Sequence, residues 1–352
     1  MKISVLLSGG VDSSVALALL KSQGFDVEAY YLKIWLEDEL SFLGNCPWDE
    51  DIEFAKQVCD KFGVKFNTIN MQAEYLSTVV EYTITELKAG RTPSPDIFCN
   101  KFIKFGAFLD KVDTSFDKVA SGHYAQIEQV EDKFFLKRAP DPVKDQTYFL
   151  NYLKQEQLSR IYFPIGEFTK KQVRDLALEF DLSNKNRADS QGICFLGKIK
   201  FSDFIKFHLG EKSGNIINID NGKILGQHRG YWYHTIGQRQ GLGLGGGPWF
   251  VVKKDIDENI IWVSNSNDIE SKRQDSLTIG KVNWISPISE DIVSKGLQVK
   301  LRHGPKLNNC NITINADESV FIKMETEDQG IAPGQFGILY DGDYCLGGGI
   351  IQ

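Results

Sequence analysis

The segment Ser8-Gly9-Gly10-Val11-Asp12-Ser13-Ser14 constrains the fold of this chain more than any other. It follows the apolar run of residues 3–7 and precedes the helical pattern of residues 15–20. Glycine permits positive φ and close approach of the backbone to a ligand, so both glycines are expected to adopt positive φ. The free N–H groups and the dipole of a helix start attract anions, and the two serine hydroxyls add donors. The segment therefore predicts a phosphate-binding turn between a strand and a helix.

The segment differs from the two common nucleotide loops. A Walker A loop requires Gly-x4-Gly-Lys-[Ser/Thr], and a dinucleotide-binding fold requires Gly-x-Gly-x-x-Gly; residues 8–14 match neither. They resemble the PP-loop, SGGxDS, of ATP pyrophosphatases, which cleave ATP between the α and β phosphates and adenylate a carbonyl oxygen. The competing interpretation is a glycine-rich turn without a ligand.

Strands and helices alternate over residues 1 to about 205. Strands are expected at 27–34, 64–69 and 118–121, and helices at 49–62, 73–89 and 101–112. Gly90 is expected to end the second helix, and Thr169 with Gln172 has the form of a capping box at the start of a later helix. This alternation predicts an α/β domain with a doubly wound parallel sheet, in which ligands lie beyond the carboxyl ends of the strands.

The pattern changes after about residue 205, where short β-like runs and turn signals dominate. With 352 residues, the chain is too long for one ordinary core. We predict a catalytic domain at 1–205, a small, mostly β central domain at 206–272 and a C-terminal β-barrel-like domain at 273–352. Tyr231-Trp232-Tyr233 is expected to be an alternating β core, with a base-stacking platform as the alternative.

Bulk composition limits the partners and the compartment. The formal net charge is −7, which taken alone argues against a nucleic-acid partner, so any RNA contact requires local basic patches. Five groups are candidates, although any one such group is more often a solvated face: Lys101 with Lys104, Lys137-Arg138, Lys170-Lys171 with Arg174, Lys185 with Arg187, and Lys300 with Arg302 and His303. No apolar run approaches the roughly 20 residues of a membrane span, and no signal peptide is expected before the first strand. The six cysteines form no Cys-x-x-Cys pair, which predicts reduced thiols in the cytoplasm.

Two of the cysteines lie outside any clear periodic apolar face. Cys99 follows Pro95-Asp96-Ile97-Phe98 near a helix start, and Cys194 lies in Gly192-Ile193-Cys194-Phe195-Leu196-Gly197. A helix N-terminus favours the thiolate form, which is the nucleophile. Asp96 is placed to act as an acid or base for a reacting group. The remaining cysteines are expected to fill the core: Cys46, Cys59, Cys310 and Cys345.

Taken in order, these segments resemble the bacterial-type tRNA 2-thiouridylase family (MnmA-type). Further matches are Ser121-Gly122-His123-Tyr124-Ala125, Lys144-Asp145-Gln146-Thr147-Tyr148-Phe149-Leu150, His234-Thr235-Ile236-Gly237-Gln238-Arg239-Gln240-Gly241 and the Gly-Gly-Gly-Pro-Trp-Phe-Val-Val run at 245–252. The resemblance runs from residue 3 to the C-terminus, and the joint order of the motifs makes it specific.

The resemblance implies a reaction and its residues. ATP activates the C2 carbonyl of the wobble uridine, and a persulfide then displaces AMP to give 2-thiouridine. Cys194 would carry the persulfide, Cys99 would be the second thiol in a transient disulfide, and Asp96 would be the acid or base. The ATP contacts carried over are Leu6, Leu7, Ser8, Gly9, Gly10, Val11, Asp12, Ser13, Leu32 and Gly122. Mg²⁺ is expected with the triphosphate, with Asp12 as a candidate ligand.

The resemblance also implies partners. Residues carried over as tRNA contacts are Ser94, Pro95, Asp96, Lys144, Asp145, Gln146, Arg302 and His303. Ser94 departs from the family's usual asparagine and shortens that contact. The expected substrates are tRNAs for lysine, glutamate and glutamine. The expected sulfur source is a persulfide donor such as a cysteine desulfurase or a sulfur-relay protein, and a monomer is expected.

Three other interpretations remain open from the residues alone. PP-loop domains also occur in amide-forming ligases, which need no cysteine pair. A non-catalytic RNA-binding protein would use ATP only to hold its shape. An iron–sulfur site would use Cys99, Cys194 and an oxygen ligand such as Asp96, although three or four thiolates are the usual anchors.

Overall fold

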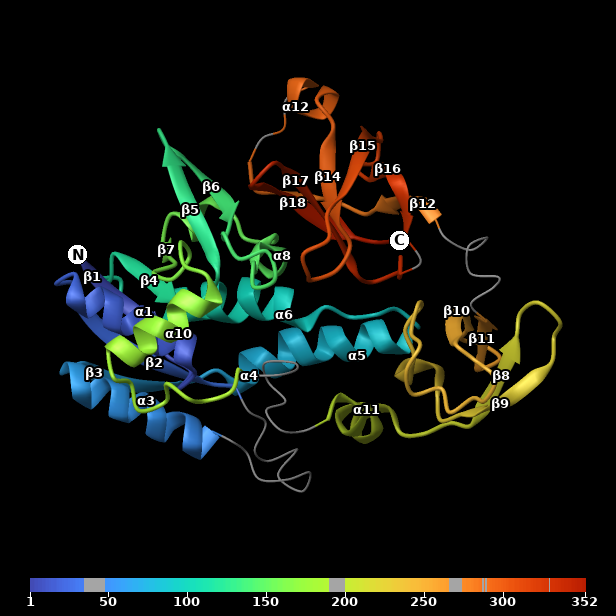
Figure 1. The fold of residues 1–352 in the computed structure, drawn as a ribbon, viewed down its shortest axis with the longest axis horizontal. Helices are drawn as coiled ribbons and strands as arrows, with labels where there is room; N and C mark the ends of the chain where they lie inside the picture. The colour runs from blue at the N-terminus through green and yellow to red at the C-terminus, as the bar shows by residue number, and fades with distance from the viewer. Residues whose placement is uncertain (35–47, 190–199, 266–273, 287, 289, 329) are drawn as a thin grey trace.

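A computed structural model describes residues 1–352 except 35–47, 190–199, 266–273, 287, 289 and 329 (Figure 1). Its N-terminal sheet has the strand order β3-β2-β1-β4-β7. The strands are β1 Lys2–Leu6, β2 Asp26–Lys33, β3 Lys65–Asn70, β4 Lys118–Ser121 and β7 Ile161–Tyr162. All four neighbouring pairs are parallel. The predicted doubly wound parallel sheet is confirmed.

The alternation of side chains along β1 separates the two faces of this sheet. Ile3 and Val5 pack with the helices α1 (Val11–Ser22) and α3 (Trp48–Phe62), whereas Leu6 joins a second apolar cluster on the opposite face. The helix α10 (Lys170–Glu179) packs against α1 and begins at the predicted capping box, in which the Thr169 hydroxyl accepts from the Gln172 N–H. Both faces of the central strand are therefore buried, as expected of a parallel sheet.

The second face is covered by two long helices that change their hydrogen-bonding pattern along their length. The first comprises α4 (Gln72–Tyr75), the π-helical segment η2 (Leu76–Val80) and α5 (Glu81–Lys88), and Gly90 follows it with φ 70°. The second comprises α6 (Pro95–Phe98), the π-helical segment η3 (Cys99–Ala107) and α7 (Phe108–Lys111). It starts before the predicted Lys101 because Pro95 is pre-organised for the first helical position.

One hairpin leaves the α/β pattern. The strands β5 (Ala125–Val130) and β6 (Lys133–Arg138) are antiparallel, and β6 pairs with β18 (Tyr344–Ile350) at the far end of the chain. The sequence pattern predicted continued strand–helix alternation here, and that prediction was wrong. The connecting segments α8 (Thr147–Leu150) and α9 (Gln155–Leu158) follow the hairpin.

The C-terminal part is an antiparallel sheet that includes this hairpin. Its order is β12-β16-β15-β14-β17-β18-β6-β5, with β13 paired to β18. The remaining bounds are β12 Gln274–Ile279, β13 Asn283–Trp284, β14 Leu297–Lys300, β15 Asn308–Ile314, β16 Val320–Asp328 and β17 Phe336–Asp341, with the helix α12 Glu290–Ser294. The predicted β-rich C-terminal part is confirmed, and in Figure 1 it lies above the α/β part.

A smaller β unit lies to the right in Figure 1, beyond the end of α5. Its sheet order is β10-β11-β8-β9, and the helix α11 (Phe201–Leu209) precedes it. The strands are β8 Gly214–Asn218, β9 Ile224–His228, β10 Trp249–Asp255 and β11 Ile260–Asn265. Tyr231-Trp232-Tyr233 forms a 3₁₀ turn, η4, so the predicted alternating β core there was wrong.

The polar ends of these aromatic side chains explain the turn. The Tyr231 hydroxyl donates to the carbonyl of Lys88 at 2.6 Å, and the Trp232 indole and the Tyr233 hydroxyl both donate to the carbonyl of Gly210. These bonds attach the turn to α5 and α11. Within the described ranges, no helix is long and apolar enough to cross a membrane.

Candidate active site

The predicted ATP residues gather at the point where the strand order reverses. The chain proceeds from β1 outward to β2 and β3, then returns to β4 on the other side of β1. Residues 8–13 begin one residue after the end of β1, and Gly122 follows β4 directly. In sheets of this type, ligands bind beyond the carboxyl ends of the strands at such a switch point. The fold therefore brings the loop after β1 and Gly122 together, although they are distant in the sequence.

The loop after β1 has the geometry of an anion site. Gly9 has φ 75°, where a side chain is disfavoured, and a Cβ there would collide with the carbonyl oxygen of Asp51. Gly10 caps α1 in an extended conformation with φ −78°, so the expectation of positive φ at both glycines holds only for Gly9. The Ser13 hydroxyl accepts from the Ser8 N–H and donates to the carbonyl of Gly10, which fixes the turn.

Gly122 touches the start of α1. A Cβ at Gly122 would lie 2.6 Å from the Ser13 nitrogen and 2.8 Å from the Asp12 carbonyl carbon. This close approach requires glycine. The next residue, His123, is buried and hydrogen-bonded to the Ser121 hydroxyl at 2.8 Å; burial lowers the pKa of His123 well below its ordinary value, so the ring is neutral.

Of the other predicted ATP residues, three are buried and one is half-buried. Leu6, Leu7 and Val11 are buried, and their side chains pack in three different apolar clusters. Leu32 is half-buried at the carboxyl end of β2, beside the strand that ends at Leu6. Leu32 is therefore placed to form an apolar wall next to the loop.

Two residues outside the predicted site residues, Asn184 and Arg187, form hydrogen bonds with the loop. Asn184 is 1% exposed, and its side-chain amide donates to the carbonyl of Gly9 at 2.8 Å and to the Ser14 hydroxyl at 2.9 Å. Arg187 donates to the same Gly9 carbonyl at 3.1 Å and pairs with Asp51. Arg187 belonged to a basic patch in the sequence, but nothing local indicated Asn184.

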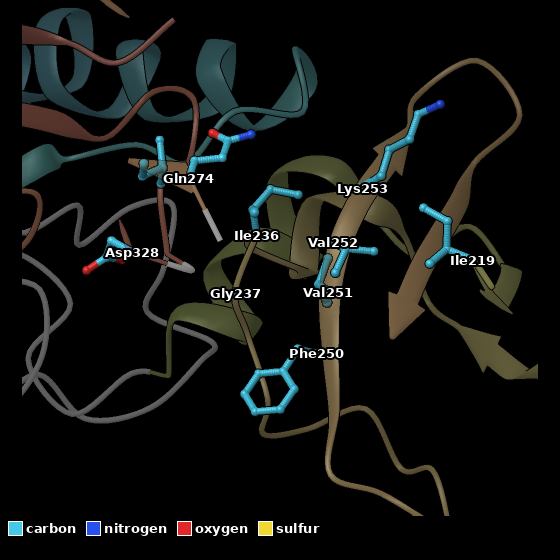
Figure 2. A pocket seen from close by; sticks show the side chains of 10 residues that line it. Ile219, Ile236, Gly237, Phe250, Val251, Val252, Lys253, Gln274 and Asp328 are labelled. Atoms are coloured by element: carbon cyan, nitrogen blue, oxygen red, sulfur yellow. The ribbon is translucent and has the colours of Figure 1, made fainter. Parts of the chain in front are cut away.

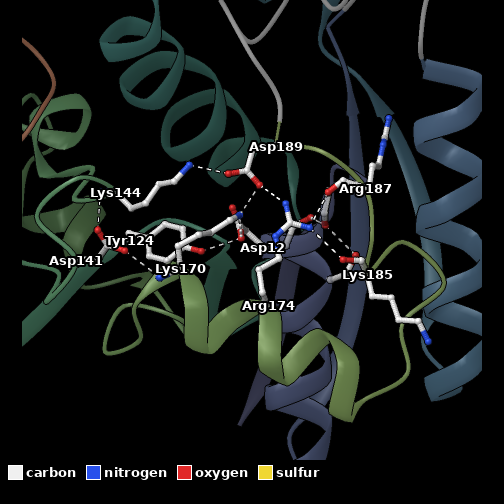
Figure 3. A network of polar contacts seen from close by, with 12 residues as sticks. Asp12, Tyr124, Asp141, Lys144, Lys170, Arg174, Lys185, Arg187 and Asp189 are labelled. Atoms are coloured by element: carbon white, nitrogen blue, oxygen red, sulfur yellow. Dashed lines mark hydrogen bonds and ion pairs between the residues drawn. The ribbon is translucent and has the colours of Figure 1, made fainter.

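Asp12 joins the loop to a network of charges (Figure 3). Its Oδ1 accepts from the Tyr124 hydroxyl at 2.8 Å and from the Lys170 ammonium group at 2.7 Å. Burial, with Asp12 beside it, raises the pKa of Tyr124, so this hydroxyl stays a donor. Tyr124 lies in the quoted 121–125 motif, and Lys170 in a basic patch, which are the signals that the sequence offered.

Asp189 collects three cations in the same network. Its carboxylate pairs with Lys144 at 2.6 Å, Lys170 at 2.7 Å and Arg174 at 2.5 Å. Burial alone would raise the pKa of Asp189, but the hydrogen-bonded ammonium groups of Lys144 and Lys170 hold it well below its ordinary value, so the carboxylate is ionised at neutral pH. Asp189 is the last described residue before 190–199, and the predicted persulfide carrier Cys194 lies outside the described residues.

Cys99 lies in the second long helix, after the first turn. Pro95 and Asp96 occupy the first turn, Ser94 is the N-cap, and the Ser94 N–H donates to the Tyr82 hydroxyl at 3.2 Å. Cys99 is 1% exposed and shares an apolar cluster with Leu6 and Phe98, so its predicted place at the helix start, off any apolar face, is corrected. Asp96 is half-buried. Reaction at the Cys99 thiol requires movement of the side chains that cover it.

The helix of Cys99 also approaches one of the predicted tRNA segments. The Asn100 side-chain amide donates to the carbonyl of Phe149 at 3.1 Å, and the Phe149 ring stacks on the exposed His303 ring at 4.8 Å. The Thr92 N–H donates to the carbonyl of Pro333 at 2.9 Å. The structure therefore places the residues before Cys99 beside the C-terminal part, near His303.

In the segment 144–146, the outer two residues are half-buried and the middle one is buried. Lys144 is half-buried and pairs with Asp189, and the Gln146 Oε1 accepts from the Tyr124 N–H at 2.9 Å. Asp145 is 1% exposed and pairs with the fully buried Lys300 at 2.9 Å, which corrects its expected direct contact with tRNA. A carboxylate enclosed in this way has no surface to offer an RNA, so Asp145 serves to position its neighbours.

Arg302 pairs with a residue that lines a cavity of about 370 Å³. Figure 2 shows side chains that line this cavity, Asp328 among them. The Arg302 guanidinium pairs with the Asp328 carboxylate, and Asp328 lines that cavity together with Phe250 and Ile331. No predicted site residue lines the cavity, and its walls are largely apolar. The exposed face of Arg302 remains accessible at the surface.

The remaining cysteines behave as expected where they are described. Cys59, Cys310 and Cys345 are buried, and burial raises the pKa of each to about 12, which makes them inert as nucleophiles. Cys46 lies outside the described residues. Across the part of the chain that the structure describes, no group of three or more His, Cys, Asp or Glu side chains has the arrangement of a metal site.

The glycine-constrained loop lies at the switch point of a parallel α/β sheet, where such sheets bind their ligands, and its sequence is that of the PP-loop class. Three family models match successive segments of the chain. A model described as the tRNA methyl transferase HUP domain matches residues 1–198, one described as the tRNA methyl transferase PRC-barrel domain matches 202–265, and one described as the aminomethyltransferase β-barrel domain matches 274–351.

Curated relatives give the family. The chain is 45% identical to the tRNA-specific 2-thiouridylase MnmA of Parabacteroides distasonis, covering 100% of this chain and 99% of the relative. It is 44% identical to MnmA 2 of a Bacteroides fragilis strain, covering 100% of both chains, and 42% identical to MnmA of Porphyromonas gingivalis, covering 100% and 99%. The chain belongs to the tRNA-specific 2-thiouridylase family.

Proposed function

We propose that this protein is a tRNA 2-thiouridine synthase. It adenylates the C2 carbonyl of the wobble uridine with ATP and then transfers sulfur from a cysteine persulfide, giving 2-thiouridine, AMP and pyrophosphate. The observation that carries this proposal is full-length identity of 42% or more to 2-thiouridylases, together with an intact anion loop at the switch point of the sheet.

The chemistry assigns a role to each site residue. The uridine O2 attacks the α-phosphorus of ATP, pyrophosphate leaves, and the poor leaving group at C2 becomes AMP. The terminal sulfur of a Cys194 persulfide attacks C2 and expels AMP. The Cys99 thiolate then attacks Sγ of Cys194, so that the sulfur stays on the base and a Cys99–Cys194 disulfide forms. A reductant from outside the protein restores both thiols.

The arrangement of the nucleotide loop supports ATP as the co-substrate. Residues 8–13 would hold the phosphates, while Leu32 and Gly122 would flank the nucleotide. Mg²⁺ binds few protein carboxylates and otherwise phosphates and water, and the Asp12 carboxylate in the first turn of α1 fits that donor set. Bound to the triphosphate, Mg²⁺ would neutralise charge on the phosphates. Asp96, half-buried ahead of Cys99, is the proposed acid or base.

The partners follow from this reaction. We propose that Ser94, Pro95 and Asp96 face the target base, and that Lys144, Gln146, Arg302 and His303 contact the tRNA. The substrates would be tRNAs for lysine, glutamate and glutamine, and the sulfur would come from a cysteine desulfurase or a relay protein. We also propose a cytoplasmic monomer, because thiols that must be reduced before each turnover need a reducing compartment.

Reconstitution tests the proposal. Purified protein, ATP with Mg²⁺, tRNA carrying an unmodified wobble uridine and a persulfide source are combined, and the digested tRNA is read by mass spectrometry. We expect sulfur in place of oxygen at the wobble uridine with the wild-type protein, and none with Cys194→Ser. Cys99→Ser is expected to stall before release, and Cys310→Ser, at a buried cysteine far along the chain, is the matched control.

Three other outcomes of these experiments would contradict the proposal or part of it. AMP and pyrophosphate without sulfur at the uridine would favour an amide-forming ligase. A Cys194→Ser protein that still thiolates tRNA would remove Cys194 as the carrier. Stoichiometric iron in anaerobically purified protein would favour the iron–sulfur interpretation.

A further inference from the structure

The carboxylate of Asp12 lies at the proposed phosphate-binding loop, where its negative charge opposes the binding of phosphate. Asp12 lies in the first turn of α1, the end of the helix at which the proposed function places the phosphates of ATP. A carboxylate there repels a polyphosphate unless cations compensate it; Mg²⁺ bound with the triphosphate would be one, and a cation held by the protein itself another. The structure supplies that cation: the Lys170 ammonium group lies 2.7 Å from Asp12 Oδ1, reaching across from the start of α10.

Lys170 is held from two sides. Its ammonium group lies 2.7 Å from Asp12 and 2.7 Å from Asp189, and its side chain is 15% exposed. A lysine ammonium has three donors, so two carboxylates leave one for a further oxygen. The backbone of Lys170 is fixed as well, because its N–H donates to Asp141 at 3.0 Å. A charge this well oriented and this little exposed is only weakly screened by salt.

Asp189 itself is not free to move with Lys170. Lys144 and Arg174 hold the same carboxylate, at 2.6 Å and 2.5 Å, and Arg174 also donates to the carbonyls of Lys185 and Arg187. Figure 3 shows these side chains converging from α10 and from the segments on either side of it. The Asp189 carboxylate therefore links Lys170 to Lys144 and Arg174 next to the loop.

We propose that Lys170 is a polyphosphate-binding residue of the nucleotide site and that Asp189 is the positioning residue that aims it. Lys170 both neutralises Asp12 and offers its third donor to a phosphate oxygen. This inference rests on the proposed use of ATP and adds to it a phosphate contact outside the 8–13 loop. It also makes α10 part of the nucleotide site.

The sequence offers a matched control in the next residue. Lys171 has the same charge on the same helix, but its side chain is 86% exposed and pairs only with Asp175 among the described contacts. Binding of inorganic pyrophosphate and of a non-hydrolysable ATP analogue is measured by calorimetry for wild type, Lys170→Met and Lys171→Met. Thermal melting of each protein checks that it is folded.

Lys170→Met is expected to weaken pyrophosphate binding about tenfold or more, the effect of losing one hydrogen bond to a charged group. Lys171→Met is expected to bind as the wild type does. If Lys170→Met does not fold, Lys170→Gln, which keeps a polar end between the carboxylates, replaces it in the comparison. Unchanged affinity in the folded Lys170 variant, or equal losses in both lysine variants, would overturn the proposal.

Asp189→Asn tests the positioning role separately. It leaves Lys170 in place but removes one of its two anchors, so we expect pyrophosphate affinity between those of the wild type and Lys170→Met, together with a steeper loss of affinity with added salt. Wild-type affinity and salt dependence in Asp189→Asn would refute that role. Failure of the wild-type protein to bind either ligand would instead refute the proposed use of ATP, and with it this inference.

Discussion

Single backbone contacts decide whether the nucleotide loop forms. Gly9 and Gly122 have no side chain because another backbone segment occupies the space, Asp51 in the first case and Asp12 with Ser13 in the second. The loop is thus clamped between α3 and the residue after β4. The three segments that meet here are far apart in the sequence, so the clamp exists only in the folded protein.

Gly122→Ala is predicted to disrupt this clamp. The added methyl group would lie 2.6 Å from the Ser13 nitrogen, so either the loop or the end of β4 must shift. We expect a loss of stability of about 1 to 3 kcal/mol and weaker binding of an ATP analogue. Urea unfolding and calorimetry measure the two effects. Gly245→Ala, where the Cβ meets nothing within 4 Å, is the control, and identical behaviour of the two variants would contradict the prediction.

The residues that could be predicted from the sequence are those whose contacts lie with close sequence neighbours. The loop at 8–14 and the capping box of Thr169 and Gln172 depend on neighbours within one turn of chain, and both are present. Asn184 could not be predicted because its partners, Gly9 and Ser14, are distant in the sequence and become its neighbours only in the folded protein. Asp145 was assigned to the surface because its burying partner, Lys300, lies in a distant strand.

Among the elements, the central β unit carries an unusual pair of histidines. The His228 Nδ1 accepts from the Gly230 N–H at 3.0 Å, and its Nε2 donates to the carbonyl of Asn259 at 3.1 Å, a pattern that only the neutral ring satisfies. The His234 ring lies 5.5 Å away, after the η4 turn. Burial, and then the neighbouring His228 and Lys254, lower the pKa of His234 to about 4.

This pair predicts that the protein loses stability in mild acid. The ordinary pKa of His234 is 6.5, so below that pH the unfolded chain binds a proton that the folded chain takes up only near pH 4. The unfolded state thus binds more protons, and the free energy of unfolding falls as the pH drops from 6.5 to 4. The contribution of His234 is at most about 3 kcal/mol.

Urea unfolding at pH 7 and pH 4.5 measures this loss. His234→Gln removes the titrating group, and we expect it to lose less stability than the wild type between the two pH values. Buried His123 remains in both proteins and cancels in the comparison. Equal losses would show that His234 is not the source.

Element types were easier to predict than element partners. The strands and helices of the first half follow their periodicity, but β5 and β6 form a hairpin whose partner, β18, lies near the C-terminus. The 3₁₀ turn at Tyr231-Trp232-Tyr233 likewise depends on carbonyl groups of α5 and of the residue after α11. Sequence periodicity reports burial, and it does not report which distant element provides it.

At the scale of the whole molecule, the α/β part and the C-terminal sheet are joined through the segment that was predicted to contact tRNA. Lys300 of β14 and Asp145 are both fully buried and pair at 2.9 Å. Asp145 also accepts from the Thr147 hydroxyl at 2.8 Å, and that hydroxyl lies 3.0 Å from the hydroxyl of Tyr340 in β17. Lys144 and Gln146 are therefore positioned by the C-terminal sheet as well as by the α/β part.

Lys300→Met, which removes this ion pair, is expected to destabilise the protein. It leaves the Asp145 carboxylate buried, with Arg138 at 3.4 Å as its remaining cation among the residues that the structure describes, and removing one partner of a buried pair costs about 3 to 5 kcal/mol. Lys323→Met breaks an exposed pair with Asp275 in the same sheet and is expected to cost no more than about 1 kcal/mol. Urea unfolding compares the two variants. Because Lys144 neighbours Asp145, the folded Lys300→Met protein should also bind tRNA more weakly than Lys323→Met. Equal stability and equal tRNA affinity would mean that the two parts hold their arrangement without this pair.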